Sequence, residues 1–118
     1  MTLKDLKNDR EITAIVSVSE EQIEMLGYTE HSIRHVSIVA KRAGELLKKL
    51  GYDEHTVELA EIAGYLHDIG NSVSRIDHAQ SGAILSYHLL TARGMDYKDA
   101  AQIMMAIGNH DEQFGVPV

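Results

Sequence analysis

The adjacent pair His67-Asp68 is the strongest candidate for chemistry in this sequence. It stands at the C-terminal end of the most apolar predicted helix of the chain, residues 54 to about 67. A carboxylate at the C-terminal end of a buried helix is desolvated and also opposes the helix dipole. A metal ion bound jointly by the imidazole and the carboxylate would compensate both effects. The pair is therefore predicted to form the centre of a metal site.

Three further histidines are placed where they can join that pair. His35 lies beside the apolar stripe of a long predicted helix, His78 begins the helix after the polar loop 71–77, and His110 follows the last predicted helix. The short loop brings His78 close to His67. Each histidine alone is more often a hydrogen-bond partner than a ligand, but the set favours a metal site. Imidazole and carboxylate ligands suit divalent Fe, Mn, Zn, Co or Ni.

The elements that must position these residues are helices, because alternating β-branched stretches are nearly absent. Residues 11–18 are either a helix or an extended segment, and a helix is favoured. The other predicted helices span residues 19–27, 29–50, 54–67, 78–93 and 97–108. The prediction is an all-α fold, a compact bundle of five to six helices in one domain over residues 1–118.

Helix starts and stops follow from local residue chemistry. Ser19 and Gln22 form a capping-box pattern that predicts a helix start, which makes Glu20 and Glu21 ordinary acids of a first turn. The predicted N-caps of the later helices are Thr29, Asp53, Asp77 and Asp96, and the predicted stops are Gly27, Gly51, Gly70 and Gly94. His55 and His88 are expected to be exposed or hydrogen-bonded rather than catalytic.

Composition narrows the function classes. The chain has 118 residues, a formal net charge of -7 and no extended Lys/Arg cluster, which argues against a nucleic-acid partner. A small phosphorylated substrate stays compatible with this charge if metal ions supply local positive charge. The absence of cysteine excludes disulfides and thiolate ligands. No signal peptide or membrane-spanning run is seen, so a cytoplasmic protein without a membrane partner is expected.

Several segments together resemble one known family. The segment AGYLHDIG over residues 63–70 is similar to the signature of the HD-domain metal-dependent phosphohydrolase superfamily. His35, 32 residues before His67, matches its first histidine. Residues 77–83 (DHAQSGA) resemble the H-x-x-x-G-A segment of members that hold two metals, and residues 107–112 resemble their later histidine segment. The resemblance spans about residues 30–115.

The resemblance implies an all-helical HD domain with one or two divalent metal ions. His35, His67 and Asp68 would be ligands of the first ion, and His78 and His110 of the second. His67 and Asp68 would be the catalytic pair, because the metal they hold activates a water molecule for attack on phosphorus. The implied substrate is a nucleotide or another small phosphorylated molecule. Single-domain members of the superfamily include (deoxy)nucleotidases and symmetrical dinucleoside tetraphosphate hydrolases.

Two departures from the family pattern stand out. The pattern closes with an aspartate on a later helix, and Asp111 is the nearest substitute here; a missing C-terminal helix is expected to explain this. Asn71 stands where many relatives have lysine, which leaves Arg75 as the nearest basic residue for a phosphate. Asn71 and Arg75 are the predicted substrate-binding residues, together with His31, which lies one turn before His35 at the expected mouth of the pocket.

Alternatives stay open at this stage. One is a helical binding or signalling module that keeps the fold but has a degenerate site, and another is a di-iron oxygenase of the same superfamily. Cyclic-dinucleotide phosphodiesterase activity is disfavoured, because the usual doubled histidine is Asn109-His110 here. The identity of the metal, the number of ions, the substrate and the formation of a homodimer are also open.

Overall fold

The chain folds into six α-helices and one 3₁₀ turn in a computed structural model that describes residues 1–27 and 33–109. Within these ranges there is no β-strand, which confirms the predicted all-helical class. No helix among them is long and apolar enough to span a membrane. The elements in chain order are α1 (Leu3–Lys7), α2 (Arg10–Met25), α3 (Ile33–Lys49), α4 (Glu54–Leu66), η1 (Ile69–Ser72), α5 (His78–Ala92) and α6 (Tyr97–Gly108).

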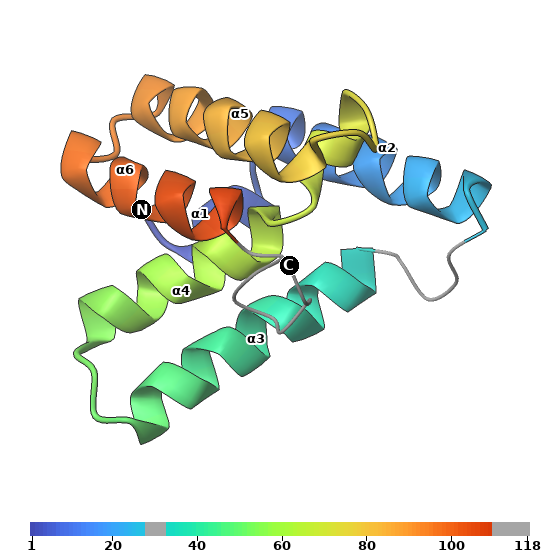
Figure 1. The fold of residues 1–118 in the computed structure, drawn as a ribbon. Helices are drawn as coiled ribbons and strands as arrows, with labels where there is room; N and C mark the ends of the chain where they lie inside the picture. The colour runs from blue at the N-terminus through green and yellow to red at the C-terminus, as the bar shows by residue number, and fades with distance from the viewer. Residues whose placement is uncertain (28–32, 110–118) are drawn as a thin grey trace.

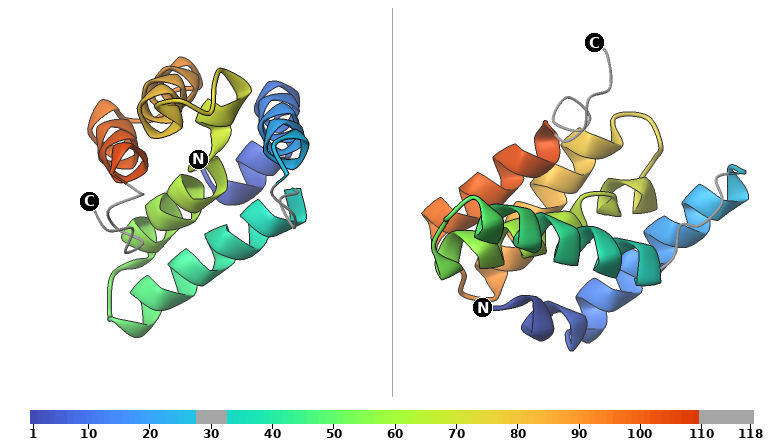
Figure 2. Two further views of the ribbon diagram at one scale, coloured as in Figure 1. Left: turned by 45° about the vertical axis from the view of Figure 1, so that its right-hand side comes forward. Right: turned by 90° about the horizontal axis from the view of Figure 1, so that it is seen from below.

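Two helical hairpins form most of the molecule. Helices α3 and α4 run antiparallel as one hairpin, and α5 and α6 form the other (Figure 1). Helix α4 is the arm of the first hairpin that packs against α6, and α2 packs along η1 on the far side of the molecule from the α3–α4 turn (Figures 1 and 2). The end of α4, η1 and the start of α5 therefore meet next to α2.

Helix α4 is the buried centre that its sequence predicts. No residue from 56 to 70 is exposed, although the segment contains both polar and apolar side chains. A helix that is covered all round needs neighbours on every side, and α1, α3 and α6 supply them. The large side chains that are almost fully buried in the core include Leu6, Ile12, Val16, Val36, Ile62, Tyr65, Leu66, Ile69, Leu90, Ile103 and Ile107.

Most of the predicted helix boundaries are confirmed. The side chains of Asp53 and Asp96 accept backbone N–H hydrogen bonds in the first turns of α4 and α6. Gly51 and Gly94 follow α3 and α5 with φ angles of 86° and 88°, a conformation that favours glycine. Asp77 holds the predicted N-cap position of α5, but it adopts a left-handed conformation and its side chain makes no capping bond. The predicted cap Thr29 lies outside the described residues.

The predicted helix start at Ser19 is wrong. Helix α2 runs unbroken through this position from its actual N-cap, Asp9, whose side chain accepts from the backbone N–H of Ile12 at 3.0 Å. Ser19 is buried, and its hydroxyl donates to the carbonyl of Val16, one turn earlier, at 2.8 Å. The alternative of an extended segment over residues 11–18 is therefore also excluded. Gly27, with a φ of 91°, ends the helix as predicted.

The sequence predicted that Gly70 ends α4, and this prediction is wrong. Helix α4 stops four residues earlier, and Gly70 lies inside η1. A Cβ atom at this position would lie 1.8 Å from the carbonyl oxygen of His78 and 2.6 Å from the backbone nitrogen of Gly82. The absence of a side chain thus allows η1 to lie directly against the first turns of α5.

Substituting Gly70→Ala should lower the free energy of unfolding by more than about 2 kcal/mol, because backbone atoms of α5 cannot move aside cheaply. Gly108→Ala is the matched control, since a Cβ there meets only the Cβ of Ala83 at an ordinary 3.6 Å. Urea denaturation of the two variants measures the difference. Equal stabilities would show that η1 is not held against α5 in this way.

An ion pair joins the start of α4 to α6. The Nε2 atom of His55 lies 3.0 Å from a carboxylate oxygen of Asp99. This hydrogen bond, with the charge of the carboxylate, raises the pKa of the exposed His55 imidazole above its ordinary 6.5. A raised folded-state pKa contributes stability below the unfolded-state pKa, and that contribution is lost as the pH rises through the folded-state value.

Asp99→Asn should therefore destabilise the protein more at about pH 5.5 than at about pH 8.5. An NMR titration should show the pKa of His55 falling toward 6.5 in the variant. His55→Gln is the control, because it removes the titrating ring and should abolish the difference between the two pH values. A His55 pKa that does not respond to Asp99→Asn would contradict the assignment.

Candidate metal centre

The carboxylate of Asp68 lies between two imidazoles. One oxygen is 3.0 Å from Nε2 of His67, and the other is 3.8 Å from Nε2 of His78. All three side chains are only 11–13% exposed. The predicted proximity of these residues is confirmed, and their role as ligands stays a prediction.

The polypeptide brings them together through the turn after α4. His67 is the C-cap of α4, Asp68 precedes η1, and His78 is the first residue of α5. The close approach of Gly70 to the backbone of His78 and Gly82 closes the turn. The site is thus built where one buried helix ends and the next begins.

Asn71 holds the backbone of this turn. It is 2% exposed, and its amide nitrogen donates to the carbonyl oxygen of Asp68 at 2.8 Å. Its amide oxygen accepts from the guanidinium of Arg75 at 3.1 Å. The carbonyl of Arg75 in turn lies 3.2 Å from Nδ1 of His78. The side chain of Asn71 is therefore engaged with the protein at both ends, while Arg75 is exposed at the surface of the turn.

The ring of His67 is oriented as in a metal-binding histidine. Its Nδ1 atom lies 2.6 Å from the carbonyl oxygen of Gly64, which can only accept a hydrogen bond, so Nδ1 carries the hydrogen. This leaves Nε2 directed at Asp68. Burial by itself lowers the pKa of His67, but the hydrogen bond and charge of Asp68 outweigh it and raise the pKa above 6.5. A proton or a cation at Nε2 is favoured.

Glu20 is a site-adjacent residue that the sequence analysis missed. It is 4% exposed on α2, the helix that packs against η1. Burial, and then the charge of Asp68, raise the pKa of Glu20 to about 7, while His67 opposes this shift. The interpretation as a first-turn acid is wrong because α2 begins ten residues earlier. The spacing of Glu20 from Val16 and Ile23 places it on the buried face.

His35 lies at the same end of the α3–α4 hairpin as this cluster. A Cβ at Gly64 would lie 2.9 Å from Cα of Ala40, which fixes the two helices side by side at that level. His35 is five residues before Ala40 and Asp68 is four after Gly64, so both are displaced toward the same end, by about 7.5 Å and about 6 Å of helix. His35 is half-buried.

The structure does not assemble the whole predicted ligand set. Among the described residues, no group of three or more His, Asp or Glu side chains is arranged to hold a metal ion. The role of His35 therefore stays a prediction. His31 and His110 lie outside the described residues. His55 pairs with Asp99, and the exposed His88 contacts the ring of Tyr87, which confirms the prediction that these two histidines are hydrogen-bonded or exposed.

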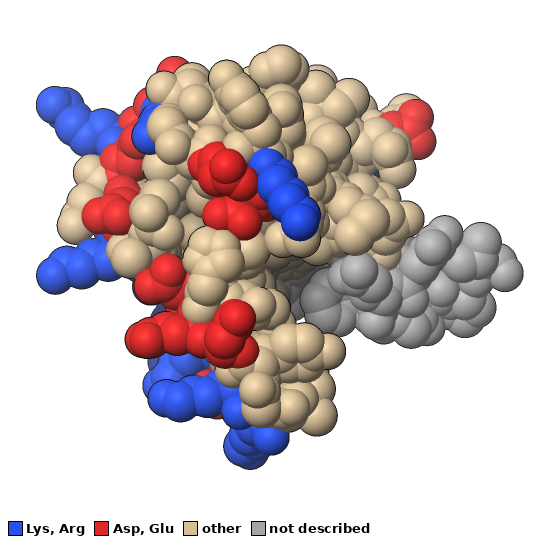
Figure 3. Space-filling model, turned by 90° about the vertical axis from the view of Figure 1, so that its left-hand side faces the viewer, with Lys and Arg blue, Asp and Glu red and all other residues tan. Residues whose placement is uncertain are grey.

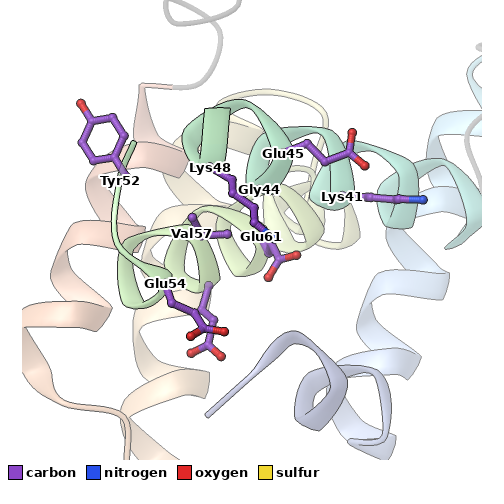
Figure 4. Close-up of a pocket in the computed structure, with 9 residues that line it drawn as sticks. Lys41, Gly44, Glu45, Lys48, Tyr52, Glu54, Val57 and Glu61 are labelled. Carbon is purple, nitrogen blue, oxygen red and sulfur yellow. The ribbon is translucent and has the colours of Figure 1, made fainter. Parts of the chain in front are cut away.

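A separate hollow of about 560 Å³ lies between α3 and α4 toward their connecting turn, at the other end of this hairpin from His67 (Figure 4). Lys41, Lys48 and four glutamates line it, with Gly44, Tyr52 and Val57. Acidic and basic side chains are also interspersed on the molecular face drawn in Figure 3. The hollow carries no histidine and differs in chemistry from the cluster around Asp68.

Asn71→Ala removes the hydrogen bond to the buried Asp68 carbonyl and the one from Arg75, and should lower the free energy of unfolding by about 1–3 kcal/mol. Arg75→Ala truncates an exposed side chain and leaves the hydrogen bond from Asn71 to Asp68 in place, so it should cost less stability than Asn71→Ala. Urea denaturation distinguishes them. An equal loss in both variants would mean that the Asn71 amide does not support the Asp68 backbone.

Comparison with known proteins gives one match. The family model described as "HD domain" matches residues 29–113, more than half of the chain. No curated protein and no solved structure matches the sequence. The matched range includes α3 to α6 and the whole turn that carries His67, Asp68 and His78.

Proposed function

Because the chain belongs to the HD-domain family, we propose that it is a metal-dependent phosphohydrolase acting on a nucleotide or another small phosphorylated molecule. The family is one of metal-dependent phosphohydrolases. The observation that carries the proposal is the buried Asp68 carboxylate, with an imidazole nitrogen facing each of its oxygens. The branch with two metals, and with it the number of ions, is part of the proposal.

The donor set fits a divalent transition metal. Asp68 offers oxygen, and His67 and His78 present Nε2 toward it, which is the mixed set that Mn, Fe, Co, Ni and Zn accept. The hydrogen bond between Nδ1 of His67 and a backbone carbonyl is the usual support of a histidine ligand. In this assignment His35, His67 and Asp68 hold the first ion, and His78 and His110 the second.

Bound metal would lower the pKa of a coordinated water and neutralise phosphoryl oxygens. The chain's own residues prepare the place for this chemistry. Asn71 keeps the Asp68 backbone in position, and the contact of Gly70 with α5 keeps His78 opposite Asp68. Burial of the three side chains limits the water that competes with substrate.

We assign substrate binding to the surface of the turn between α4 and α5. Arg75 is exposed and linked through Asn71 to the backbone of Asp68, so its guanidinium is the described cation most directly connected to the centre. An arginine can hold a phosphate through two parallel hydrogen bonds. Both polar atoms of the Asn71 amide already make hydrogen bonds within the protein. Asn71 would therefore contribute to substrate binding mainly by positioning Arg75. His31 is retained as a third proposed substrate contact.

Phosphate release from a panel of nucleotides in Mn²⁺, with activity lost in EDTA, is the expected result. Asp68→Asn should lower kcat by about 100-fold or more, because loss of a ligand should exceed the 10–100-fold typical of residues that only support ligands. Asp77→Asn makes the same chemical change at an exposed carboxylate and should leave kcat unchanged.

Elemental analysis of the purified protein separates this function from its rivals. A protein that takes up no transition metal and releases no phosphate would instead be a binding module. Oxygen consumption with an organic substrate, without phosphate release, would indicate the di-iron oxygenase chemistry. Full activity of Asp68→Asn would also overturn the proposal.

A further inference from the structure

We infer that the turn between η1 and α5 selects the substrate, with Val73 and Ile76 packing against the base of a nucleotide whose phosphate lies beside Arg75. The inference rests on the proposed function and deepens it, because it narrows the small phosphorylated molecules of that proposal to those that carry a flat apolar group. It assigns a role to two residues of the turn that the proposed metal centre does not use.

Val73 and Ile76 are aliphatic side chains that the fold leaves in water. They are 69% and 78% exposed, the highest values of any valine, leucine or isoleucine in the described part of the chain. Single exposed aliphatic residues are common, but these two lie three positions apart in a turn whose other members, Ser74, Arg75 and Asp77, are polar or charged. Hydration of apolar surface is unfavourable, so a ligand that covers both side chains gains free energy.

Hydrogen bonds within the turn hold the backbone that carries these side chains (Figure 1). The backbone N–H groups of Val73 and Ser74 both donate to the carbonyl of Gly70, at 2.9 and 3.1 Å. The N–H of Ile76 donates to the hydroxyl of Ser74 at 3.1 Å. Asp77 then adopts a φ of 55°, which no other described residue except glycine matches in sign, and such a costly conformation persists only where its surroundings impose it. A backbone that is already ordered lowers the entropy cost of binding a ligand.

The turn also lies close to the proposed centre. Ile76 is two residues before His78, so their Cα atoms are at most about 7.6 Å apart. The carbonyl oxygen of Arg75 lies 3.2 Å from Nδ1 of His78, which ties this part of the turn to the start of α5. Val73 directly follows η1, whose rise of about 2 Å per residue keeps it within about 10 Å of Asp68. A phosphate beside Arg75 therefore has both aliphatic side chains within the length of a nucleotide.

A nucleotide combines the two kinds of group that this turn can bind. Its phosphate is anionic and pairs with the guanidinium of Arg75, whereas its base has two flat faces that pack against aliphatic side chains. Inorganic phosphate and sugar phosphates offer the anionic group alone. Contact with the base, remote from the reacting phosphorus, is the same in the ground state and the transition state, so it should lower KM and leave kcat unchanged.

Phosphate release in Mn²⁺ from the most active nucleoside 5′-monophosphate and from the corresponding pentose 5-phosphate, which lacks only the base, tests the inference. The wild type should have a KM for the nucleotide that is at least about 10-fold lower than for the pentose phosphate. In the double variant Val73→Thr, Ile76→Thr, the KM for the nucleotide should rise by about 10-fold with kcat unchanged. The KM for the pentose phosphate should not change.

Leu50→Thr is the matched control. It also replaces an exposed aliphatic side chain next to a turn, but at the other end of the α3–α4 hairpin from His67, and it should leave both KM values unchanged. Because all the substituted positions are exposed, every variant should melt close to the wild-type temperature.

A nucleotide KM that the double variant leaves unchanged, or an equal rise in KM for both substrates, would overturn the inference and leave the proposed function standing. If no phosphate is released, isothermal titration calorimetry with adenosine 5′-monophosphate decides. Binding that the double variant weakens and Leu50→Thr does not would support the base-binding turn and overturn the proposed hydrolysis. No binding by the wild type would overturn both.

Discussion

The desolvated carboxylate of Asp68 is the constraint on which the rest of this site depends. It stands at the C-terminal end of the most enclosed helix of the fold, where both burial and the helix dipole oppose a negative charge. Nε2 of His67 and Nε2 of His78 face its two oxygens and offset that cost. Such an arrangement is costly for a core that serves stability alone, and it is well suited to binding a cation.

Backbone contacts around Asp68 hold His67, Asp68 and His78 close together. A glycine at position 70 lets η1 touch α5, so that the end of one helix and the start of the next face each other. Asn71 then joins the Asp68 backbone to Arg75, which connects the interior of the site to its rim. The geometry comes from backbone contacts and one amide, and it does not require a large apolar pocket.

Much of the fold follows from local signals. The aspartate caps and the left-handed glycines act within one turn of chain, so the starts of α4 and α6 and the ends of α3 and α5 could be predicted from short stretches. The predicted start at Ser19 failed because a capping pattern cannot act inside a helix that tertiary packing continues. Gly70 was misread for a related reason, since close backbone approach and helix termination both select glycine.

The sequence by itself determined the helical class, the buried centre of α4, the pairing of His67 with Asp68, and the closeness of His78, because one short loop links them. The ligand roles of His35, His67, Asp68, His78 and His110 stay predictions, as do the substrate contacts at His31, Asn71 and Arg75. Only the tertiary structure decided that Glu20 is buried within electrostatic reach of Asp68 and His67, and that Asn71 holds the Asp68 backbone. The burial of Glu20 depends on how α2 packs against η1, and a contact between segments distant in sequence leaves no local pattern. The hydrogen bond from Asn71 to Asp68 spans only three residues, but it belongs to η1, which follows the end of α4.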